Sequence, residues 1–204
     1  FDVIGTDPYP IPGKPAGTAL EWTRTTRDQS YGTRAVWQVP QVFDWGAYRK
    51  GEERAKTRAP TLEEMRSMAW QCVAAGANGL VFYSFFDLYK MKDRDPFEKR
   101  WADVCAMAGE IKRFIPVLLS AEPAPAVTCE GAPMVEARAW RTGKEVYLLV
   151  VNGSSEPAAA TVAVAGGFAS AQAEFGQAPT AKEGGKLAFA LAPLEPVMVR
   201  LAAP

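Results

Sequence analysis

The sequence predicts an α/β region over residues 1–120 followed by an all-β region over residues 121–204. The first region alternates strand-like and helix-like segments in the order β-α-β-α-β-α, which is typical of parallel strands joined by right-handed crossovers. Residues 121–125, Ala-Glu-Pro-Ala-Pro, form a stiff linker where the character of the chain changes. Beyond the linker, about six short strands separated by turn signals predict a small antiparallel β-sandwich.

The composition excludes several classes of partner and site. The chain has 204 residues, of which 48% are hydrophobic and 23% charged, and its formal net charge is zero. This neutrality argues against nucleic acid or an anionic membrane as the main partner, and no apolar run approaches the roughly 20 residues that span a bilayer. Because the chain lacks histidine and paired C-x-x-C spacing, we expect neither a metal nor a cofactor.

Two strands and one helix are predicted near the start of the chain. Residues 1–7 form a short strand that leads into a loop held extended by prolines. A helix is expected over residues 16–30, although its threonines are weak helix formers. A second strand follows over residues 33–39 and is ended by Pro40.

A connection of about twenty residues, 40–59, follows the second strand, and connections of this length are usually functional or mobile. It contains Gln41 and the aromatic residues Phe43, Trp45 and Tyr48. These rings form either a small core within the loop or a stacking surface for a ligand. The charged run that follows them is most simply a solvated surface.

The clearest helix and strand lie between Pro60 and Asp87. Thr61 and Glu64 have the spacing of a capping box, and Gly76 ends the helix that they begin. Residues 80–86 form a continuous apolar run, which predicts a third strand covered on both faces. Polar groups occur only at the end of this run, where α/β folds bind ligands.

The third helix starts at Asp95-Pro96, with Asp as the N-cap and Pro at the first position. Helical spacing predicts its inner face, and Pro116 is expected to bend or end it. The residues predicted to face inward are Trp101, Val104, Cys105, Ala108 and Ile111.

The cysteines are predicted to be structural. Cys72 and Cys105 fall on apolar helix faces, and Cys129 falls in an expected strand, so we predict buried, reduced thiols. Residue 1 is Phe, and the chain enters a strand at once. We therefore expect a fragment that lacks its N-terminal part, and the alternative is a processed mature N-terminus.

Four stretches together resemble a known family. D-P-Y-P, V-W-Q-V-P-Q-V-F-D-W, R-A-P-T-L-E-E-M-R-S-M-A-W and G-A-N-G-L-V-F-Y-S resemble the last three β/α units of a glycoside-hydrolase TIM barrel. The all-β region is similar to the C-terminal β domains that follow such barrels. The resemblance implies a partial (β/α)8 barrel whose strands six to eight are residues 1–7, 33–39 and 80–86. A full barrel needs roughly 250 residues, so about half of it is absent. The sequence does not assign a compartment, and the resemblance is compatible with a secreted or periplasmic parent protein.

The resemblance also implies a chemistry. Most glycosidases use two carboxylates, and the large retaining clan places its glutamates after strands four and seven. Strand four falls in the absent part, and after strand seven this sequence has Gln38 and Gln41. A glutamine cannot act as a nucleophile, but it can hydrogen-bond sugar hydroxyls. Either both catalytic acids lie upstream, or the protein uses another pair, or it has lost catalysis.

Asp7 is the best carboxylate for a direct catalytic role, because a barrel strand would deliver it to the active face; the alternative is that it caps the proline-rich turn. Several aromatic residues are candidates for stacking on sugar rings, with packing as the alternative for each, and three polar residues are candidates for binding hydroxyls. The stacking candidates are Tyr9, Trp37, Trp45, Tyr83 and Phe86. The hydroxyl-binding candidates are Gln38, Gln41 and Asp87.

The sequence therefore predicts the C-terminal part of a carbohydrate-active barrel enzyme, inactive alone; the alternative is a non-catalytic carbohydrate-binding or scaffold module. A nucleotide-binding protein is excluded because the sequence has no phosphate-binding glycine motif. The open strand edges of a half barrel invite pairing, so we expect the chain to bind the missing N-terminal half or itself. We also expect Asp7, Gln38 and Asp87 to share one rim, because their segments should lie side by side and run in the same direction.

Overall fold

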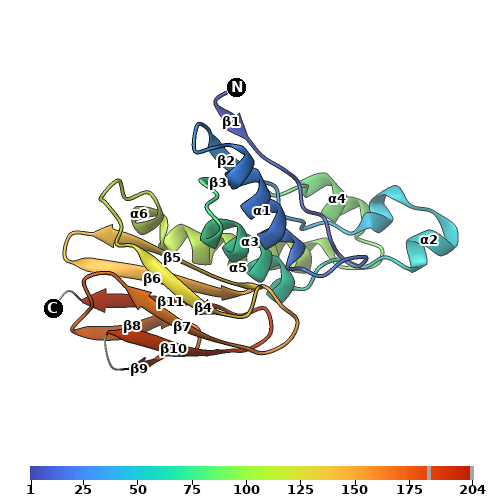
Figure 1. Cartoon of the computed structure of the whole chain (residues 1–204). Coiled ribbons are helices and arrows are strands. Elements are labelled where there is room, and N and C mark those ends of the chain that lie inside the picture. The colour runs from blue at the N-terminus through green and yellow to red at the C-terminus, as the bar shows by residue number, and fades with distance from the viewer. Residues whose placement is uncertain (183–184, 203–204) are drawn as a thin grey trace. The chain divides into compact units, whose positions relative to one another are not determined.

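A computed structural model of the chain describes residues 1–182 and 185–202. The chain divides into two compact units, residues 1–112 and residues 113–204, which are coloured from blue to green and from green to red in Figure 1. Each unit has its own sheets.

The first unit contains a parallel sheet of three short strands in the order β1-β2-β3. β1 is Val3–Ile4, β2 is Ala35–Gln38 and β3 is Gly79–Leu80. Val3 pairs with Ala35, and Trp37 pairs with Gly79, so the central strand connects the other two. The prediction that the three segments lie side by side and run in the same direction is confirmed, although the strands are shorter than expected.

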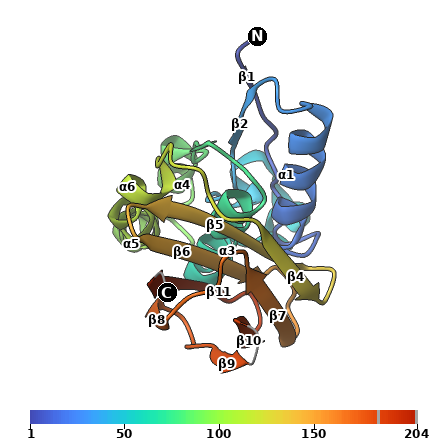
Figure 2. The ribbon, with the colours of Figure 1, turned by 60° about the vertical axis from the view of Figure 1, so that its left-hand side comes forward.

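Helices follow each strand. α1 packs against β2 and α3, and Figure 2 shows α1 running alongside β1 and β2. The region after β2 contains a short 3-10 helix, η1, and one turn of helix, α2. The bounds are α1 Thr18–Gln29, η1 Trp45–Tyr48, α2 Gly51–Ala55, α3 Leu62–Ala74, α4 Phe85–Lys90 and α5 Phe97–Arg113.

The predicted capping box of α3 is confirmed. The Thr61 hydroxyl accepts a hydrogen bond from the Glu64 backbone N–H at 3.1 Å, and the Glu64 carboxylate accepts one from the Thr61 N–H at 2.8 Å. Gly76 follows the helix with φ at +112°, a conformation that glycine adopts without steric cost. The helix thus has a defined start and end, and most of its residues are buried.

One hydrophobic cluster lies beneath the sheet. It is built from residues of α3, α4 and α5 together with the segment after β2, and two side chains from the β3 segment pack against it. Its buried members are Val42, Met65, Ala69, Leu88, Val104 and Met107, with Leu80 and Phe82 against them. The two faces of β2 differ: Val36 and Gln38 are 3% and 0% exposed, whereas Trp37 between them is 47% exposed, so one face of the sheet is covered and the other is open.

The prediction of a strand over residues 80–86 is wrong beyond its first residue. β3 ends at Leu80, Tyr83 keeps a single bridge to Gln41, and Ser84 caps α4 by accepting a hydrogen bond from the backbone N–H of Asp87. The Ser-x-x-Asp spacing is a helix-start signal that outweighs the apolar run. The run is also not covered on both faces, because Val81 is 44% exposed.

The predicted inner face of α5 is partly wrong. Trp101 and Cys105 are exposed, whereas Arg100, Val104 and Met107 are the buried residues. The Arg100 guanidinium donates to the Val42 carbonyl at 3.2 Å, so the aliphatic stem of a charged residue occupies a core position. The prediction of buried thiols is confirmed for one cysteine only: Cys72 is buried, and Cys105 and Cys129 are exposed.

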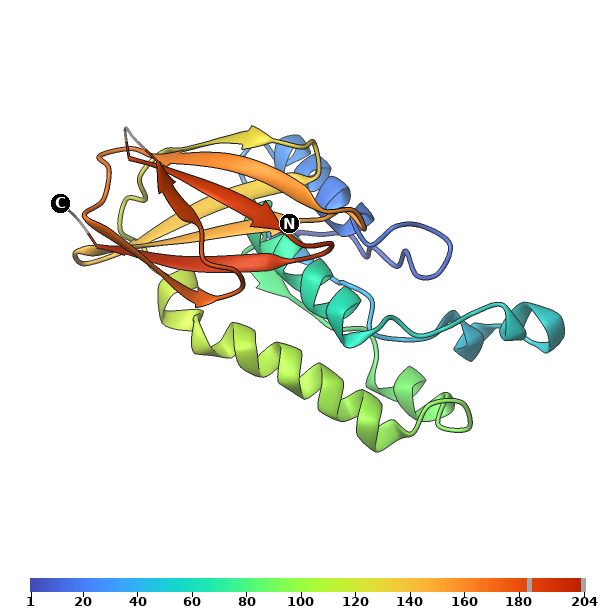
Figure 3. The ribbon, with the colours of Figure 1, turned by 90° about the horizontal axis from the view of Figure 1, so that it is seen from below.

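The second unit is built from antiparallel strands, as Figure 3 shows. A short helix, α6, precedes two four-stranded sheets with the orders β4-β7-β10-β9 and β5-β6-β11-β8. The predicted all-β region is therefore confirmed. Two of its strands, β4 and β9, are absent from the prediction. Only β4 had a signal in the sequence, because Cys129 was expected to lie in a strand. The bounds are α6 Ile115–Leu118, β4 Val127–Gly131, β5 Val135–Thr142, β6 Glu145–Asn152, β7 Ala158–Val164, β8 Ser170–Phe175, β9 Thr180–Lys182, β10 Lys186–Leu191 and β11 Pro196–Ala202.

The two antiparallel sheets share one hydrophobic core. Leu148 and Val199 come from one sheet, Val162 and Leu187 come from the other, and all four are 0% exposed. Alternate residues of facing strands meet in this core, which is the packing expected for strands with a period of two.

Candidate functional site

The segments that leave the carboxyl ends of β1, β2 and β3 bring aromatic rings together. We call these rings the rim cluster: Tyr9, Phe43, Trp45, Tyr48 and Tyr83. Neighbouring ring centroids lie between 5.0 and 6.3 Å apart, mostly edge to face. Tyr9 and Tyr83 are stacked, with centroids 6.0 Å apart and planes at 29°. Because each strand contributes, the sheet topology itself assembles the cluster.

Asp87 is the polar centre beside these rings. Its side chain is 1% exposed, yet both carboxylate oxygens have partners. One oxygen accepts from the Tyr48 hydroxyl at 2.6 Å and the Ser84 hydroxyl at 2.7 Å, and the other accepts from the Lys90 ammonium at 2.8 Å. The Tyr48 and Tyr83 hydroxyl oxygens are 3.1 Å apart, so the network extends onto an exposed ring.

This network determines the protonation of the rim. Burial raises the pKa of Asp87, but hydrogen bonds from Lys90, Tyr48 and Ser84 outweigh it and leave the pKa below its ordinary value. Burial, followed by the hydrogen bond to Asp87, raises the pKa of Tyr48. Burial, with the charge of Asp7 next, raises the pKa of Tyr9 to about 12. At neutral pH the rim therefore carries an ionised carboxylate beside neutral phenols.

Gln38 and Gln41 are fully buried. The Gln38 amide oxygen accepts from the Thr6 backbone N–H at 3.0 Å and from the Thr6 hydroxyl at 2.8 Å. Gln41 accepts from the Ile11 N–H at 2.8 Å and donates to the Ile11 carbonyl at 2.9 Å. Both amides hold the β1 segment and its loop in place, which is a different task from the hydroxyl binding predicted for them.

The remaining candidates are more dispersed. Asp7 is exposed at the end of the β1 segment, near enough to Tyr9 for its charge to affect that phenol. Trp37 is 47% exposed on the uncovered face of the sheet, where a Cβ at Gly79 would lie 2.8 Å from its ring. Phe86 is 74% exposed and contacts Phe85, not the rim cluster. The structure thus brings together Tyr9, Trp45, Tyr83 and Asp87, with Asp7 nearby.

Three members of the network are absent from the sequence-based site. Tyr48 was predicted only as one of several aromatic residues in the long connection, and Ser84 only as a polar group after the apolar run. The helix-capping spacing of Ser84 and Asp87 is the signal that relates them. Lys90 had no signal of its own, because its role depends on α4 placing it one turn after Asp87.

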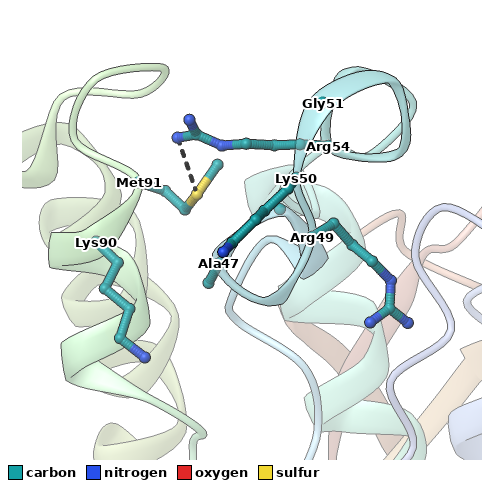
Figure 4. Close-up of a pocket in the computed structure, with 8 residues that line it drawn as sticks. Ala47, Arg49, Lys50, Gly51, Arg54, Lys90 and Met91 are labelled. Carbon is teal, nitrogen blue, oxygen red and sulfur yellow. Dashed lines mark hydrogen bonds between the residues drawn. The ribbon is translucent and has the colours of Figure 1, made fainter.

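Two cavities adjoin the rim cluster. The first, which we call the Trp45 pocket, has a volume of about 460 Å³. The second, which we call the Met91 pocket, has a volume of about 380 Å³ and lies between η1, α2 and α4; Figure 4 shows its side chains. The Trp45 pocket is lined by Tyr9, Pro10, Pro12, Gly13, Lys14, Thr18, Trp22, Trp45, Arg49 and Thr57.

Residues 1–182 and 185–202 contain no cluster of three or more acidic or cysteine side chains arranged to hold a metal ion. Within the same residues, no helix combines the length and apolarity required to cross a bilayer.

Comparisons with known proteins show similarity in fold. No protein-family model matches this sequence. No curated protein sequence matches it either. Among solved structures, an Anoxybacillus α-amylase has a TM-score of 0.56 at 12% identity, and the match covers 93% of this chain and 45% of the amylase. An α-amylase from Geobacillus thermoleovorans in complex with acarbose has a TM-score of 0.51 at 11% identity, covering 89% and 41%.

A GH30 endoxylanase from Clostridium papyrosolvens also matches, with a TM-score of 0.49 at 13% identity, covering 100% of this chain and 49% of the xylanase. The chain thus spans less than half the length of each of these three solved chains. The mixed α/β fold with antiparallel sheets is similar to part of the fold of the two α-amylases, in agreement with the resemblance.

Proposed function

We propose that this chain is part of a longer carbohydrate-active protein and contributes to its sugar-binding face. Residues 1–112 supply the last three β/α units of a (β/α)8 barrel, and residues 113–204 supply a β-sandwich. The two amylase matches support this proposal at the level of fold. The rim cluster and Asp87 are the part of that face which this chain provides.

The observation that carries the proposal is the position of the rim cluster. Aromatic rings, phenol hydroxyls and an ionised carboxylate gather where three parallel strands end, which is the binding face of such folds. A sugar ring presents apolar C–H faces to aromatic rings and hydroxyls to polar groups. Tyr83 and Tyr48 offer both kinds of contact, since each is partly exposed and has its hydroxyl in the Asp87 network.

We further propose that the chain is inactive alone. A glycosidase needs one carboxyl group as an acid and a second as a nucleophile or base. Asp87 has a lowered pKa and three hydrogen-bond donors, so it is poorly suited to deliver a proton. Asp7 is left as a single exposed candidate, and the second carboxylate must come from elsewhere in the parent protein.

A non-catalytic binding module is the second candidate. The observation that favours it is that Gln38 and Gln41, which stand where a retaining enzyme would have a glutamate, are both used to hold the loop after β1. In this alternative the rim binds sugar, and the parent protein hydrolyses nothing.

Calorimetric titration of the 204-residue chain with a panel of neutral and acidic oligosaccharides tests the proposal. We expect at least one to bind, and we expect Tyr83→Ala to weaken binding by about tenfold through loss of stacking. Tyr31→Ala changes an exposed tyrosine outside the rim and serves as the control. Absence of binding across the panel would refute the sugar-binding role. Hydrolysis by the chain that disappears in Asp7→Asn would refute inactivity alone.

The uncovered face of the β1-β2-β3 sheet exposes apolar side chains, as expected of a surface that a partner buries. Val3, Trp37 and Val81 are each more than 40% exposed, and β1 and β3 each have one unpaired edge. We propose that the N-terminal part of the same parent protein covers this face, because each solved neighbour is more than twice the length of its match to this chain.

Light scattering tests whether the exposed face of this sheet is an interface. The 204-residue chain should self-associate through the exposed face, and Val81→Lys should reduce that association by placing a charge on it. A version of the parent extended upstream should be monomeric. A monomer of the 204-residue chain with native near-ultraviolet circular dichroism would contradict the proposal.

A further inference from the structure

The Trp45 pocket combines aromatic walls with positive charge. Three rings line it: Tyr9, Trp45 and, from the exposed side of α1, Trp22. The Arg49 guanidinium carbon lies 5.4 Å from the centre of the Trp45 ring, and the Lys14 ammonium lies 5.8 Å from the centre of the Trp22 ring. Each cation thus stands beside an aromatic surface within the range of cation–π attraction.

The pocket has no negative charge in its wall. None of its lining residues is Asp or Glu. Within residues 1–182 and 185–202, neither Lys14 nor Arg49 forms an ion pair with a carboxylate. Arg54, Lys90 and Arg94 in the neighbouring segments are each paired with an aspartate. Two unpaired cations on one pocket therefore favour an anionic ligand.

The wall of the pocket is held in place before any ligand binds. Gln41 clamps Ile11 through both of its backbone groups, and the Lys14 N–H donates to the Pro10 carbonyl at 2.7 Å. The Trp45 indole N–H donates to the Tyr9 carbonyl at 3.3 Å. A preformed wall reduces the entropy lost on binding, and this gives the buried Gln41 a role as a positioning residue.

The neighbouring Met91 pocket is a weaker candidate, although it is lined by more cations. Arg54 is paired with Asp93 at 2.7 Å, and Lys90 is paired with Asp87 at 2.8 Å. Figure 4 shows the Arg49 side chain directed away from Met91 and Lys90, and its guanidinium lies beside Trp45 instead. The charge of Arg49 therefore belongs to the Trp45 pocket.

We propose that the Trp45 pocket binds a saccharide that carries an anionic substituent, either a carboxylate or a sulfate. The sugar ring stacks on the indole and phenol surfaces, and the anion lies within reach of Lys14 and Arg49. The volume of about 460 Å³ accommodates a sugar unit. This inference rests on the proposed function and narrows it from carbohydrate to acidic carbohydrate.

Matched ligands test whether the Trp45 pocket prefers a sugar that carries a negative charge. The 204-residue chain is titrated calorimetrically with tetragalacturonate, with a 6-sulfated galactotetraose and with neutral galactotetraose at low salt. We expect the better of the two charged ligands to bind at least about tenfold more tightly than the neutral one, since charged hydrogen bonds contribute most to recognition. That advantage should shrink as salt is raised, because salt screens exposed charges.

Variants locate the site. Lys14→Met and Arg49→Met should each weaken binding of the charged ligand by about fivefold to tenfold and leave the neutral ligand unchanged. Trp22→Ala should weaken both. Lys50→Met removes an exposed cation that lines only the Met91 pocket, so it is the matched control and should have no effect.

The outcomes separate the two proposals. Preference for the carboxylate over the sulfate, or the reverse, identifies the substituent. Equal binding of neutral and charged ligands overturns the anionic pocket and leaves the sugar-binding role intact. A charge preference that Lys50→Met abolishes and Arg49→Met does not would move the site to the Met91 pocket and overturn the inference. No binding of these three ligands by a chain that binds another member of the oligosaccharide panel overturns the anionic pocket alone. Absence of binding across these ligands and the whole panel overturns both proposals.

Discussion

The two units differ in how they bury the faces of their sheets. In residues 113–204 each antiparallel sheet turns its apolar face to the other, and core residues such as Leu148 and Val199 are 0% exposed. In residues 1–112 the parallel sheet is covered by helices on one face only, and Val81 on the other face is 44% exposed. A sheet that buries one face is complete in an antiparallel fold, whereas parallel sheets are normally buried on both. The second unit thus encloses its core between two sheets, whereas one face of the sheet in the first unit is open.

The contrast extends to polar groups. In the first unit, buried side chains such as Gln41 and Asp87 hold loops and the rim through hydrogen bonds. In the second unit the only such residue among those described is Asn152, whose amide donates to the Glu156 and Ala192 carbonyls, and charged contacts such as Arg200 with Glu145 are exposed pairs. Removing a buried hydrogen-bonded group costs much more than removing one member of an exposed pair, so more of the costly polar positions lie in the first unit.

The largest effect is expected from the shared core of the second unit. Leu148→Ala should lower the free energy of unfolding by about 3 kcal/mol, because it leaves a cavity in a closely packed interior. Val81→Ala, on the uncovered face of the first unit, should change it by less than about 0.5 kcal/mol. Calorimetry and urea unfolding measure both. A cost at Val81 comparable to that at Leu148 would show that something already covers the face in this chain.

The next effect comes from the loop after β1. Gln41→Leu should cost about 2 kcal/mol, because the Ile11 N–H and carbonyl lose their buried partners. Gln29→Leu, on the exposed end of α1, is the matched control and should be nearly neutral. Tryptophan fluorescence reports the change, because every tryptophan except Trp140 lies in residues 1–112. Equal stability of the two variants would refute the clamp.

Local signals in the sequence predicted much of the fold. The capping box at Thr61 and Glu64 predicted the start of α3, and short strand-like segments between turn signals indicated most strands of the second unit. The strand predicted over residues 80–86 was too long, because an apolar run alone does not distinguish a strand from a strand followed by a helix. The Ser84 cap indicates that a helix starts there, whereas the apolar residues around it favour a strand.

The candidate site was harder to predict than the fold. Position after a strand was enough to select Tyr9, Tyr83 and Asp87, because parallel strands deliver such residues to one edge. The same rule selected Gln38 and Gln41, whose amides hydrogen-bond to Thr6 and Ile11 in the segment after β1, since strand position does not say which face a side chain takes. Trp22 and Lys14, which line the Trp45 pocket, meet only through tertiary structure and had no signal in the sequence.

A smaller effect is expected at the start of α3, the helix that supports the covered face of the parallel sheet. Thr61→Ala should cost about 1 kcal/mol by removing the hydroxyl that accepts from the Glu64 N–H. Thr61→Ser keeps the hydroxyl and should restore most of the stability. Hydrogen exchange in the first turn of α3 should rise in the alanine variant and stay unchanged in the second unit. Equal protection in both variants would mean that packing alone holds this helix end.

The finest test of the contrast is the acid response of Asp87. Its pKa is lowered from an ordinary value of 3.8, so its stabilising contribution is complete above that value and is lost as the pH falls through the lower folded value. Asp87→Asn removes this titration, so wild-type stability should fall more steeply than that of the variant below the ordinary value. Urea midpoints from pH 6 down to about pH 2.5, followed by tryptophan fluorescence, measure the two slopes. Glu145→Gln, in an exposed pair of the second unit, should leave the slope unchanged, because such pairs are screened by solvent. If Glu145→Gln flattened the acid response and Asp87→Asn did not, the polar support of the fold would lie in the second unit, and the contrast between the two units would fail.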